Sequence, residues 1–284
     1  MLIRMDLLTA DARRNGYGVT GTCPMSIEAV KWSFQAAERV HAPLMLCCHA
    51  HIPDAMPLEM AGDVVSYYAR KYDQVPAALC MDHGNCFEDA ARAIRAGFTG
   101  VMVDRFLDPV EENARIVKET VRFAHSANVS VEAALGGPRT RDASFADIEA
   151  SLTKVDEAKW FCEQTDVDCL AVAVGSYHGE HKTITSVMHF DLIEELNRVC
   201  SAALVMHGTS FMGDENIARA ARSGIAKFNV SGDMTAAAIA GGRKALQTDA
   251  EDRRLLLPFY QAIGDSYVER TAQFMALVGS ANRW

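Results

Sequence analysis

Residues 77–104 read AALCMDHGNCFEDAARAIRAGFTGVMVD, and this stretch contains a complete strand–helix–strand unit. The apolar runs Ala77–His83 and Gly100–Asp104 lack clean polar–apolar alternation, which is typical of parallel strands buried on both faces. Phe87–Ala96 between them has the composition of a helix and ends at Gly97, a residue suited to closing one. The stretch therefore predicts a βαβ unit.

The same alternation continues along the whole chain. Eight apolar segments are predicted to be strands: Gly18–Cys23, Pro43–Ala50, Ala77–His83, Gly100–Asp104, Val129–Leu135, Cys169–Ser176, Ala203–His207 and Ile225–Val230. Helical patterns fall between them: Ile27–Val40, Phe87–Ala96, Val110–Ala127, Asp156–Thr165, Asp191–Cys200 and Asp214–Ser223. Since no linker or composition shift divides the 284 residues, we predict one α/β domain over residues 1–284, a (β/α)8 TIM barrel.

An open, doubly wound sheet is the alternative architecture. Such a sheet usually carries a glycine-rich fingerprint after its first strand, and Gly16, Gly18 and Gly21 do not form one. Two regions depart from the strand–helix repeat. Gly136–Val155 has no strand pattern and is predicted to be a mobile active-site loop. The tail from Asp233 to Gly279 predicts one or two long additional C-terminal helices, broken near Pro258.

Composition excludes several classes of function. The chain has 28 Lys and Arg against 37 Asp and Glu, a net charge of −9, so a general nucleic-acid binder is not expected. No apolar run reaches the roughly 18 residues of a membrane span, and the start lacks a signal-peptide pattern. Eight cysteines without a CxxC pair predict a cytoplasmic chain with reduced thiols.

Three histidines lie at or just past the ends of predicted strands and are each followed by glycine: His83, His178 and His207. Because all strands of a barrel point the same way, these side chains are expected on one rim, with Asp82 beside the first. A single histidine there would be an ordinary polar residue. Three neutral imidazoles instead suit a catalytic zinc ion with an open fourth position. Two further carboxylates lie on neighbouring strands: Asp104 and Glu132.

A phosphate site is predicted next to this rim. Lys182 lies four residues after His178. The turns after the last two strands supply backbone N–H groups and hydroxyls, from Gly208, Thr209, Ser210, Asn229, Val230, Ser231 and Gly232. Such residues are also ordinary in turns, but barrels often bind phosphate at this place.

Six motifs in order resemble the class II, metal-dependent ketose-bisphosphate aldolases of the fructose- and tagatose-bisphosphate type. The resemblance covers about residues 15–280 and rests on ALCMDHG, GFTGVMVD, VEAALG, SYHGEHK, LVMHGTS followed by DENI, and AKFNVSGDM. It implies a homodimer or homotetramer built with the C-terminal helices, which otherwise simply cover the barrel. It also implies a small-molecule sugar phosphate as the substrate, and no nucleic-acid or membrane partner.

The resemblance implies a role for each matching residue. Zn²⁺ would be bound by His83, His178 and His207, and Asp82 would be the acid/base on the hydroxyl that becomes the aldehyde. Asp104 and Glu132 would lie next to the metal or bind a second mono- or divalent cation. The phosphate and dihydroxyacetone-phosphate part would be held by Gly179, Lys182, Gly208, Ser210 and Asn229. Retro-aldol cleavage leaves an enediolate, whose charge a Lewis-acidic Zn²⁺ stabilises.

The chain also departs from the family pattern. Ala134 stands where a second Glu is common, and Arg141 stands where a Glu shuttles the enediolate proton, so Asp142 becomes the candidate for that role. His49 occupies the place of a substrate-facing Ser. These changes favour an unusual substrate. They leave open an isomerase or epimerase that uses the same enediolate, and a non-catalytic partner subunit of an aldolase.

Overall fold

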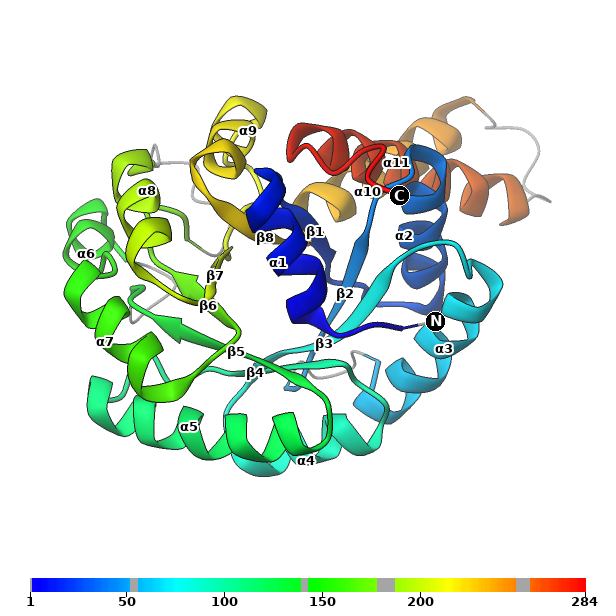
Figure 1. Cartoon of the computed structure of the whole chain (residues 1–284). Helices are drawn as coiled ribbons and strands as arrows, with labels where there is room; N and C mark the ends of the chain where they lie inside the picture. Colours follow the sequence, from blue (N-terminus) through cyan, green and yellow to red (C-terminus); the bar gives the residue numbers. More distant parts are fainter. Residues whose placement is uncertain (1, 52–55, 139–142, 178–186, 249–255) are drawn as a thin grey trace.

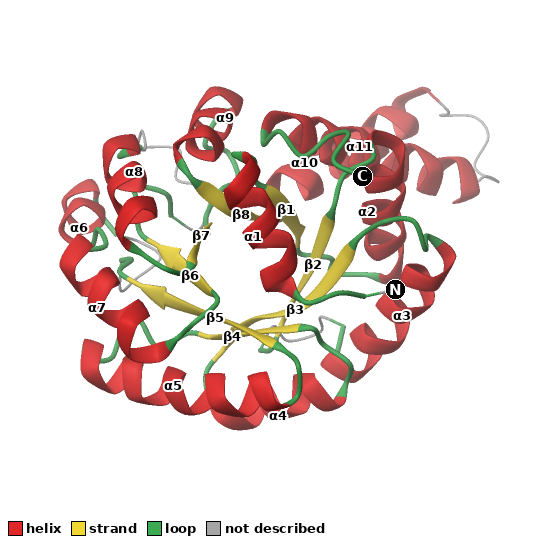
Figure 2. Cartoon of the chain, in the orientation of Figure 1, coloured by secondary structure: helices red, strands yellow, loops and turns green. Residues whose placement is uncertain are grey.

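The computed structural model describes residues 2–51, 56–138, 143–177, 187–248 and 256–284. Eight parallel strands pair in chain order, and β1 pairs with β8 to close a barrel (Figures 1 and 2). The strands are β1 Val19–Thr22, β2 Leu44–His49, β3 Ala77–Gly84, β4 Gly100–Val103, β5 Ser130–Leu135, β6 Cys169–Val172, β7 Ala203–Met206 and β8 Ile225–Val230. The predicted TIM barrel is therefore confirmed, and the open-sheet alternative is wrong.

Helices surround the barrel and cover its strands (Figure 2). In the described part of the chain they are α1 Met5–Asn15, α2 Ile27–Val40, α3 Leu58–Lys71, α4 Phe87–Arg95, α5 Val110–Ser126, α6 Phe145–Ala150, α7 Val155–Thr165, α8 Phe190–Val199, α9 Asp214–Ser223, α10 Gly232–Thr248 and α11 Leu256–Leu277. Local signals set several ends: the Ser26 side chain accepts from the Ala29 N–H at the start of α2.

Alternation along each strand divides the buried side chains into two layers. On β3, Leu79 and Met81 pack against the helices, whereas Ala78 and Cys80 belong to the cluster inside the barrel. Since successive side chains point to opposite faces, Asp82 is the next inward position after Cys80. It lies at the carboxyl end of the strand, so strand geometry alone directs this carboxylate into the barrel mouth.

Helix α1 closes the opposite end of the barrel and was not predicted from the sequence. Figure 1 shows it across the ring of strands, and it contacts the first residues of β5 and β6, Ser130 and Cys169. The Ile3 N–H donates to the Ala77 carbonyl at 2.8 Å, and the Asp6 N–H donates to Ser130 Oγ at 3.1 Å. Because α1 occupies the amino-terminal end, the carboxyl-terminal rim is the end available for a site.

Two other predictions are refined by the structure. Part of Gly136–Val155, predicted as a loop, forms α6, which begins with a capping box between Ser144 and Asp147. The C-terminal tail forms α10 and α11, and Pro258 lies in the first turn of α11, where proline is tolerated. Helix α11 packs on α2, with the rings of Trp32 and Tyr267 5.6 Å apart.

The described residues contain no helix that is both long and apolar enough to cross a membrane. All eight cysteines are free thiols, and seven of them are buried.

Candidate active site

Two of the three predicted metal ligands meet at the carboxyl-terminal rim. His83 lies near the end of β3 and His207 directly follows β7, and their rings make an edge-to-face contact with centroids 4.9 Å apart. His83 Nε2 and His207 Nδ1 are 3.3 Å apart. Two nitrogens bound to one tetrahedral zinc ion at about 2.0–2.1 Å are separated by about 3.3 Å. The pair therefore fits two ligands of a common ion.

A carboxylate contacts the other nitrogen of each ring. Asp104 Oδ2 lies 2.6 Å from His83 Nδ1, and Glu132 Oε1 lies 2.9 Å from His207 Nε2. This carboxylate–histidine arrangement fixes the orientation of metal-binding imidazoles in many proteins. Asp104 Oδ1 is buried and has no hydrogen-bond partner among the described residues, and a buried anionic oxygen favours a nearby cation.

The electrostatic field at this rim is also negative. Burial alone would lower the pKa of His83, but Asp82 and the contact with Asp104 outweigh it and raise that pKa to about 9. A raised imidazole pKa means that positive charge is stabilised at this position. The donor set and the field therefore both suit a divalent metal.

Lys227 is a site residue that sequence reasoning missed. It lies on β8, is 1% exposed, and its Nζ is 2.5 Å from Glu132 Oε2. Burial would raise the pKa of Glu132, but Lys227 and His207 lower it, so the buried carboxylate stays ionised. The only signal in the sequence was a lysine inside an otherwise apolar strand pattern, and its partner lies 95 residues away.

Asp82 lies beside the histidine pair and is held by Asn229. Asn229 Nδ2 donates to Asp82 Oδ1 at 3.0 Å, which leaves Oδ2 toward His49 Nε2 at 3.6 Å and Cys23 Sγ at 3.9 Å. Burial would raise the pKa of Asp82, but the nearby histidines, His83 foremost, lower it below its usual range. Asp82 is therefore a buried carboxylate that is held in its ionised form.

The two residues near Asp82 Oδ2 differ in character. The His49 ring is stacked on that of His83, with centroids 5.3 Å apart and an interplanar angle of 8°. Contact with the Cys47 thiol and burial raise the pKa of Cys23, so its neutral S–H can point at the carboxylate. Sequence reasoning placed His49 near the substrate and did not single out Cys23.

The backbone at the end of β3 departs from regular strand geometry. The pairing of β3 with β4 shifts register between Met81 and Gly84, and His83 has a left-handed backbone with φ of 51°. A Cβ on Gly84 would lie 2.3 Å from Met81 Cε and 2.7 Å from the Met102 carbonyl oxygen. This irregularity places Asp82 and His83 on the same rim, although they are consecutive in the chain.

The predicted phosphate loops lie together at the ends of β7 and β8. The Gly232 N–H donates to Ser210 Oγ at 2.9 Å, at the start of α10. Thr209 and Val230 are 1% exposed; the Thr209 hydroxyl donates to the Asn229 carbonyl, which joins the two loops. Val230 therefore belongs to the core, whereas Thr209 lines the neighbouring cavity together with Ser210 and with Gly232 at the start of α10.

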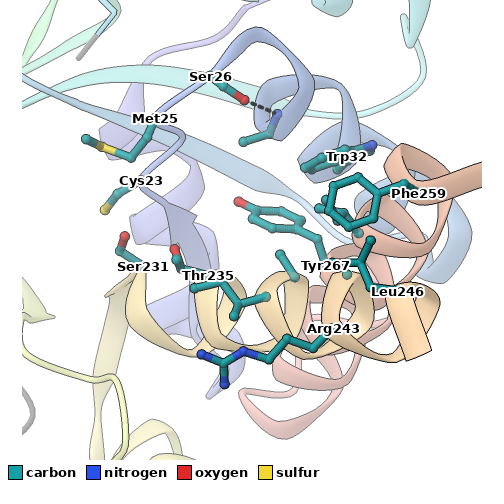
Figure 3. Close-up of a pocket in the computed structure, with 15 residues that line it drawn as sticks. Cys23, Met25, Ser26, Trp32, Ser231, Thr235, Arg243, Leu246, Phe259 and Tyr267 are labelled. Carbon is teal, nitrogen blue, oxygen red and sulfur yellow. Dashed lines mark hydrogen bonds between the residues drawn. The ribbon is translucent and has the colours of Figure 1, made fainter. Parts of the chain in front are cut away.

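A cavity of about 210 Å³ connects these groups. Its lining includes Cys23, His49, Asp82, Tyr177, His207, Gly208, Ser210, Asn229, Ser231 and Gly232. Cys23 and Ser231 also line a second, larger cavity of about 350 Å³, with Met25, Trp32, Phe259 and Tyr267 among its walls (Figure 3). This second cavity is mostly apolar and lies between α2, α10 and α11. Cys23 and Ser231 thus line both the smaller cavity beside Asp82 and the larger apolar cavity.

Four predicted site residues lie outside the described part of the chain: His178, Gly179, Lys182 and Asp142. The other predicted site residues lie close together at the ends of β2, β3, β7 and β8. Asp104 and Glu132 contact the ring nitrogens of His83 and His207 that do not face the proposed ion.

Comparison with known proteins identifies the group of enzymes that share this arrangement. The family model described as Fructose-bisphosphate aldolase class-II matches residues 3–283. A fructose-bisphosphate aldolase of Helicobacter pylori (strain ATCC 700392 / 26695) is 30% identical over 310 aligned positions, which cover 100% of both chains.

Solved structures show the same fold. The YdjI aldolase from Escherichia coli K12 superposes with a TM-score of 0.87 at 27% identity, over 100% of this chain and 99% of that one. Fructose-bisphosphate aldolase (Fba) from Campylobacter jejuni has a TM-score of 0.83 at 16% identity, over 100% and 97% of the two chains. Because the family model spans almost every residue and the Helicobacter relative matches end to end, this chain belongs to the class II fructose-bisphosphate aldolase family, a family of metal-dependent lyases.

Proposed function

We propose that the chain is a zinc-dependent aldolase that cleaves or forms a C–C bond in a ketose phosphate. The observation that carries the proposal is the 3.3 Å spacing of His83 Nε2 and His207 Nδ1 beside the ionised Asp82. His83 and His207 would hold the ion together with His178. The bound ion would supply Lewis-acid stabilisation of the enediolate charge.

Asp82 is proposed to move the proton of the reacting hydroxyl. In the cleavage direction its Oδ2 accepts the proton of the C4 hydroxyl as the C3–C4 bond breaks, and the aldehyde leaves. Asn229 orients the carboxylate by binding Oδ1. The lowered pKa of Asp82 keeps it ionised before the reaction, so the base form is present at neutral pH.

The loops after β7 and β8 are proposed to bind the phosphate of the ketone half. Ser210 receives the Gly232 N–H, so its own hydroxyl proton is directed elsewhere and can be donated to a phosphate oxygen. Backbone N–H groups at the start of α10 add the partial positive charge of a helix N-terminus. The aldehyde half would then lie on the other side of Asp82, near His49 and Cys23.

The neighbourhood of the aldehyde half supports a substrate other than fructose bisphosphate. Next to Cys23 the second cavity is walled mostly by apolar side chains, and among the described residues that line it Arg243 is the one charged residue (Figure 3). An apolar wall stabilises an apolar group and does not compensate the desolvation of a second phosphate. A ketose 1-phosphate whose aldehyde half is uncharged fits this environment better.

The test replaces Asp82 by Asn and follows products by NMR over a panel of ketose phosphates with one or two phosphates. We expect wild type to release dihydroxyacetone phosphate, and D82N to lose about 10²–10⁴-fold in kcat because the base is gone. Metal content, measured by elemental analysis, should stay near wild type. The matched control is Asp168→Asn, which removes a carboxylate from another Asp–His pair away from the rim.

Failure of the zinc-loaded wild type to release a triose phosphate from any member of the panel would contradict the proposal. Conversion of a ketose phosphate into an isomer without cleavage would assign the chain to the isomerase alternative. Turnover by D82N at the wild-type rate would remove Asp82 from the mechanism.

A further inference from the structure

Two side chains of the aldehyde side converge on one oxygen of Asp82. Cys23 Sγ lies 3.9 Å and His49 Nε2 lies 3.6 Å from Asp82 Oδ2, and the three ligand atoms all lie within 4.8 Å of one another. Around a tetrahedral zinc ion with bonds of about 2.0–2.3 Å, ligand atoms are about 3.3–3.6 Å apart. Shifts of a few tenths of an ångström to about 1 Å would bring the set to that spacing.

Neighbouring side chains orient two of the three ligands, Asp82 and His49, toward a common point. Asn229 binds Asp82 Oδ1 and turns Oδ2 toward Cys23 and His49. The His49 ring is stacked against the His83 ring and cannot turn freely. Cys23 and Asp82 are 8% and 2% exposed, and all three side chains line the same 210 Å³ cavity.

We propose that Cys23, His49 and Asp82 form a second cation site, distinct from the histidine site, that takes Zn²⁺ or another thiophilic divalent metal. Thiolate, imidazole and carboxylate together are a zinc-type ligand set, and three protein ligands leave a fourth position open to the cavity. The cation would take the place of the Cys23 thiol proton that now points at Asp82. Proton release therefore accompanies binding.

The second site would act as an inhibitory one. It uses Asp82 Oδ2, the oxygen that the proposed mechanism needs for the substrate proton, so a cation there removes the base. It also lies next to the histidine site, which would carry a divalent charge when loaded, so the affinity of the second site should then be the weaker of the two. The inhibitory effect and the order in which the two sites fill rest on the proposed function; binding at Cys23, His49 and Asp82 does not.

The experiment titrates chelator-treated protein with Co²⁺, a spectroscopic substitute for zinc. The histidine site contains no sulfur, so the near-ultraviolet thiolate-to-cobalt charge-transfer band reports the second site alone. We expect the first equivalent to bind without the band and the second to produce it. C23S should bind one equivalent without the band, and H49Q should weaken the second equivalent at least about 10-fold.

Two controls separate this site from other thiols and from the histidine site. Cys86→Ser removes a half-buried thiol at the start of α4 and should leave the band unchanged. H207A removes one proposed ligand of the histidine site, leaves the stacking of His49 on His83 in place and should retain the band. Excess Zn²⁺ should inhibit wild-type aldol cleavage and inhibit C23S less.

A wild-type titration that reaches saturation without the band would overturn the proposal. A band that survives C23S would assign the sulfur to another cysteine and would overturn it equally. Because these readouts need no substrate, they stand even if the chain proves not to cleave ketose phosphates.

Discussion

At the scale of single residues, a chain of contacts runs from Lys227 in the barrel interior through Glu132 to His207, a proposed metal ligand. Glu132 receives Lys227 on one oxygen and His207 on the other. We expect Glu132→Gln to lower zinc affinity about 10–100-fold, because the amide no longer holds the His207 ring as an anion does. Competition with a fluorescent chelator measures this affinity.

A matched change elsewhere shows whether the effect belongs to the rim. Asp168→Asn alters an Asp–His pair of the same length, 2.9 Å, with His125. It should leave zinc affinity unchanged. Equal losses in both variants would show that general destabilisation, and not His207 orientation, explains the result.

The turn after β7 requires glycine at position 208, because it leaves no room for a Cβ atom. Its φ is 63°, and a Cβ there would lie 2.4 Å from the backbone carbonyl of Tyr177. We expect Gly208→Ala to lose activity through displacement of the phosphate loop and to cost more than the roughly 1–2 kcal/mol of left-handed strain alone. Urea denaturation and KM measure the two effects.

The control is Gly16→Ala at the end of α1. Gly16 has nearly the same φ, 66°, but apart from its chain neighbours and the backbone of its own helix no atom of the described residues lies within 4 Å of its Cβ position. Gly16→Ala should therefore lower the free energy of unfolding only by the backbone strain of a left-handed alanine. An equal loss of stability in the two variants would show that the backbone at Tyr177 moves to accommodate the added Cβ, and would contradict the prediction.

At the scale of elements, α1 is anchored beneath the barrel by Asp6. Burial alone would raise the pKa of Asp6, but its contacts with Arg4 and Ser130 lower it below the ordinary 3.8. A lowered folded-state pKa stabilises the fold above pH 3.8, and this stabilisation disappears as pH falls through the folded-state value. We expect Asp6→Asn to cost about 1 kcal/mol near neutral pH and progressively less below pH 4.

Thermal unfolding of both proteins across this pH range measures the difference. Asp63→Asn, at an exposed position of α3, is the control and should show no such convergence. A Tm difference for D6N that is constant from neutral to acid pH would contradict the assigned role of Asp6.

At the scale of the whole molecule, the C-terminal helices expose apolar side chains that suit contact with another copy. Leu246, Leu256 and Leu257 are 67%, 68% and 68% exposed. We propose a homodimer or homotetramer in which this surface is covered, and expect L256S/L257S to lower the mass measured by light scattering at micromolar concentration. Leu7→Ser, at a 56% exposed leucine of α1, is the control. A monomeric wild type would contradict the proposal.

Much of the barrel could be predicted because its signals are local. Each strand is a short apolar run, each helix has its own spacing and caps, and the rim follows from the rule that all strands point the same way. Hence the eight strands, with ends displaced by a few residues, and the meeting of Asp82, His83 and His207 could be anticipated.

The docking of α1 under the barrel could not be predicted in the same way. Its 11 residues encode a helix, but its place depends on contacts with strands more than 60 residues away. The same holds for Lys227: nothing near it in the chain shows that Glu132 will neutralise it.

The strand–helix alternation, the strand ends at His83 and His207, and the family could thus be predicted from the sequence, since these are patterns between near neighbours or motifs that follow one another in order along the chain. The contacts of each Asp82 oxygen follow only from the tertiary structure: Asn229 donates to Oδ1, whereas His49 and Cys23 lie near Oδ2. Such contacts depend on closure of the barrel, which brings β1, β2, β3 and β8 to one rim within a few ångströms. The spacing of these residues along the chain does not show which of their atoms come within a few ångströms of each other.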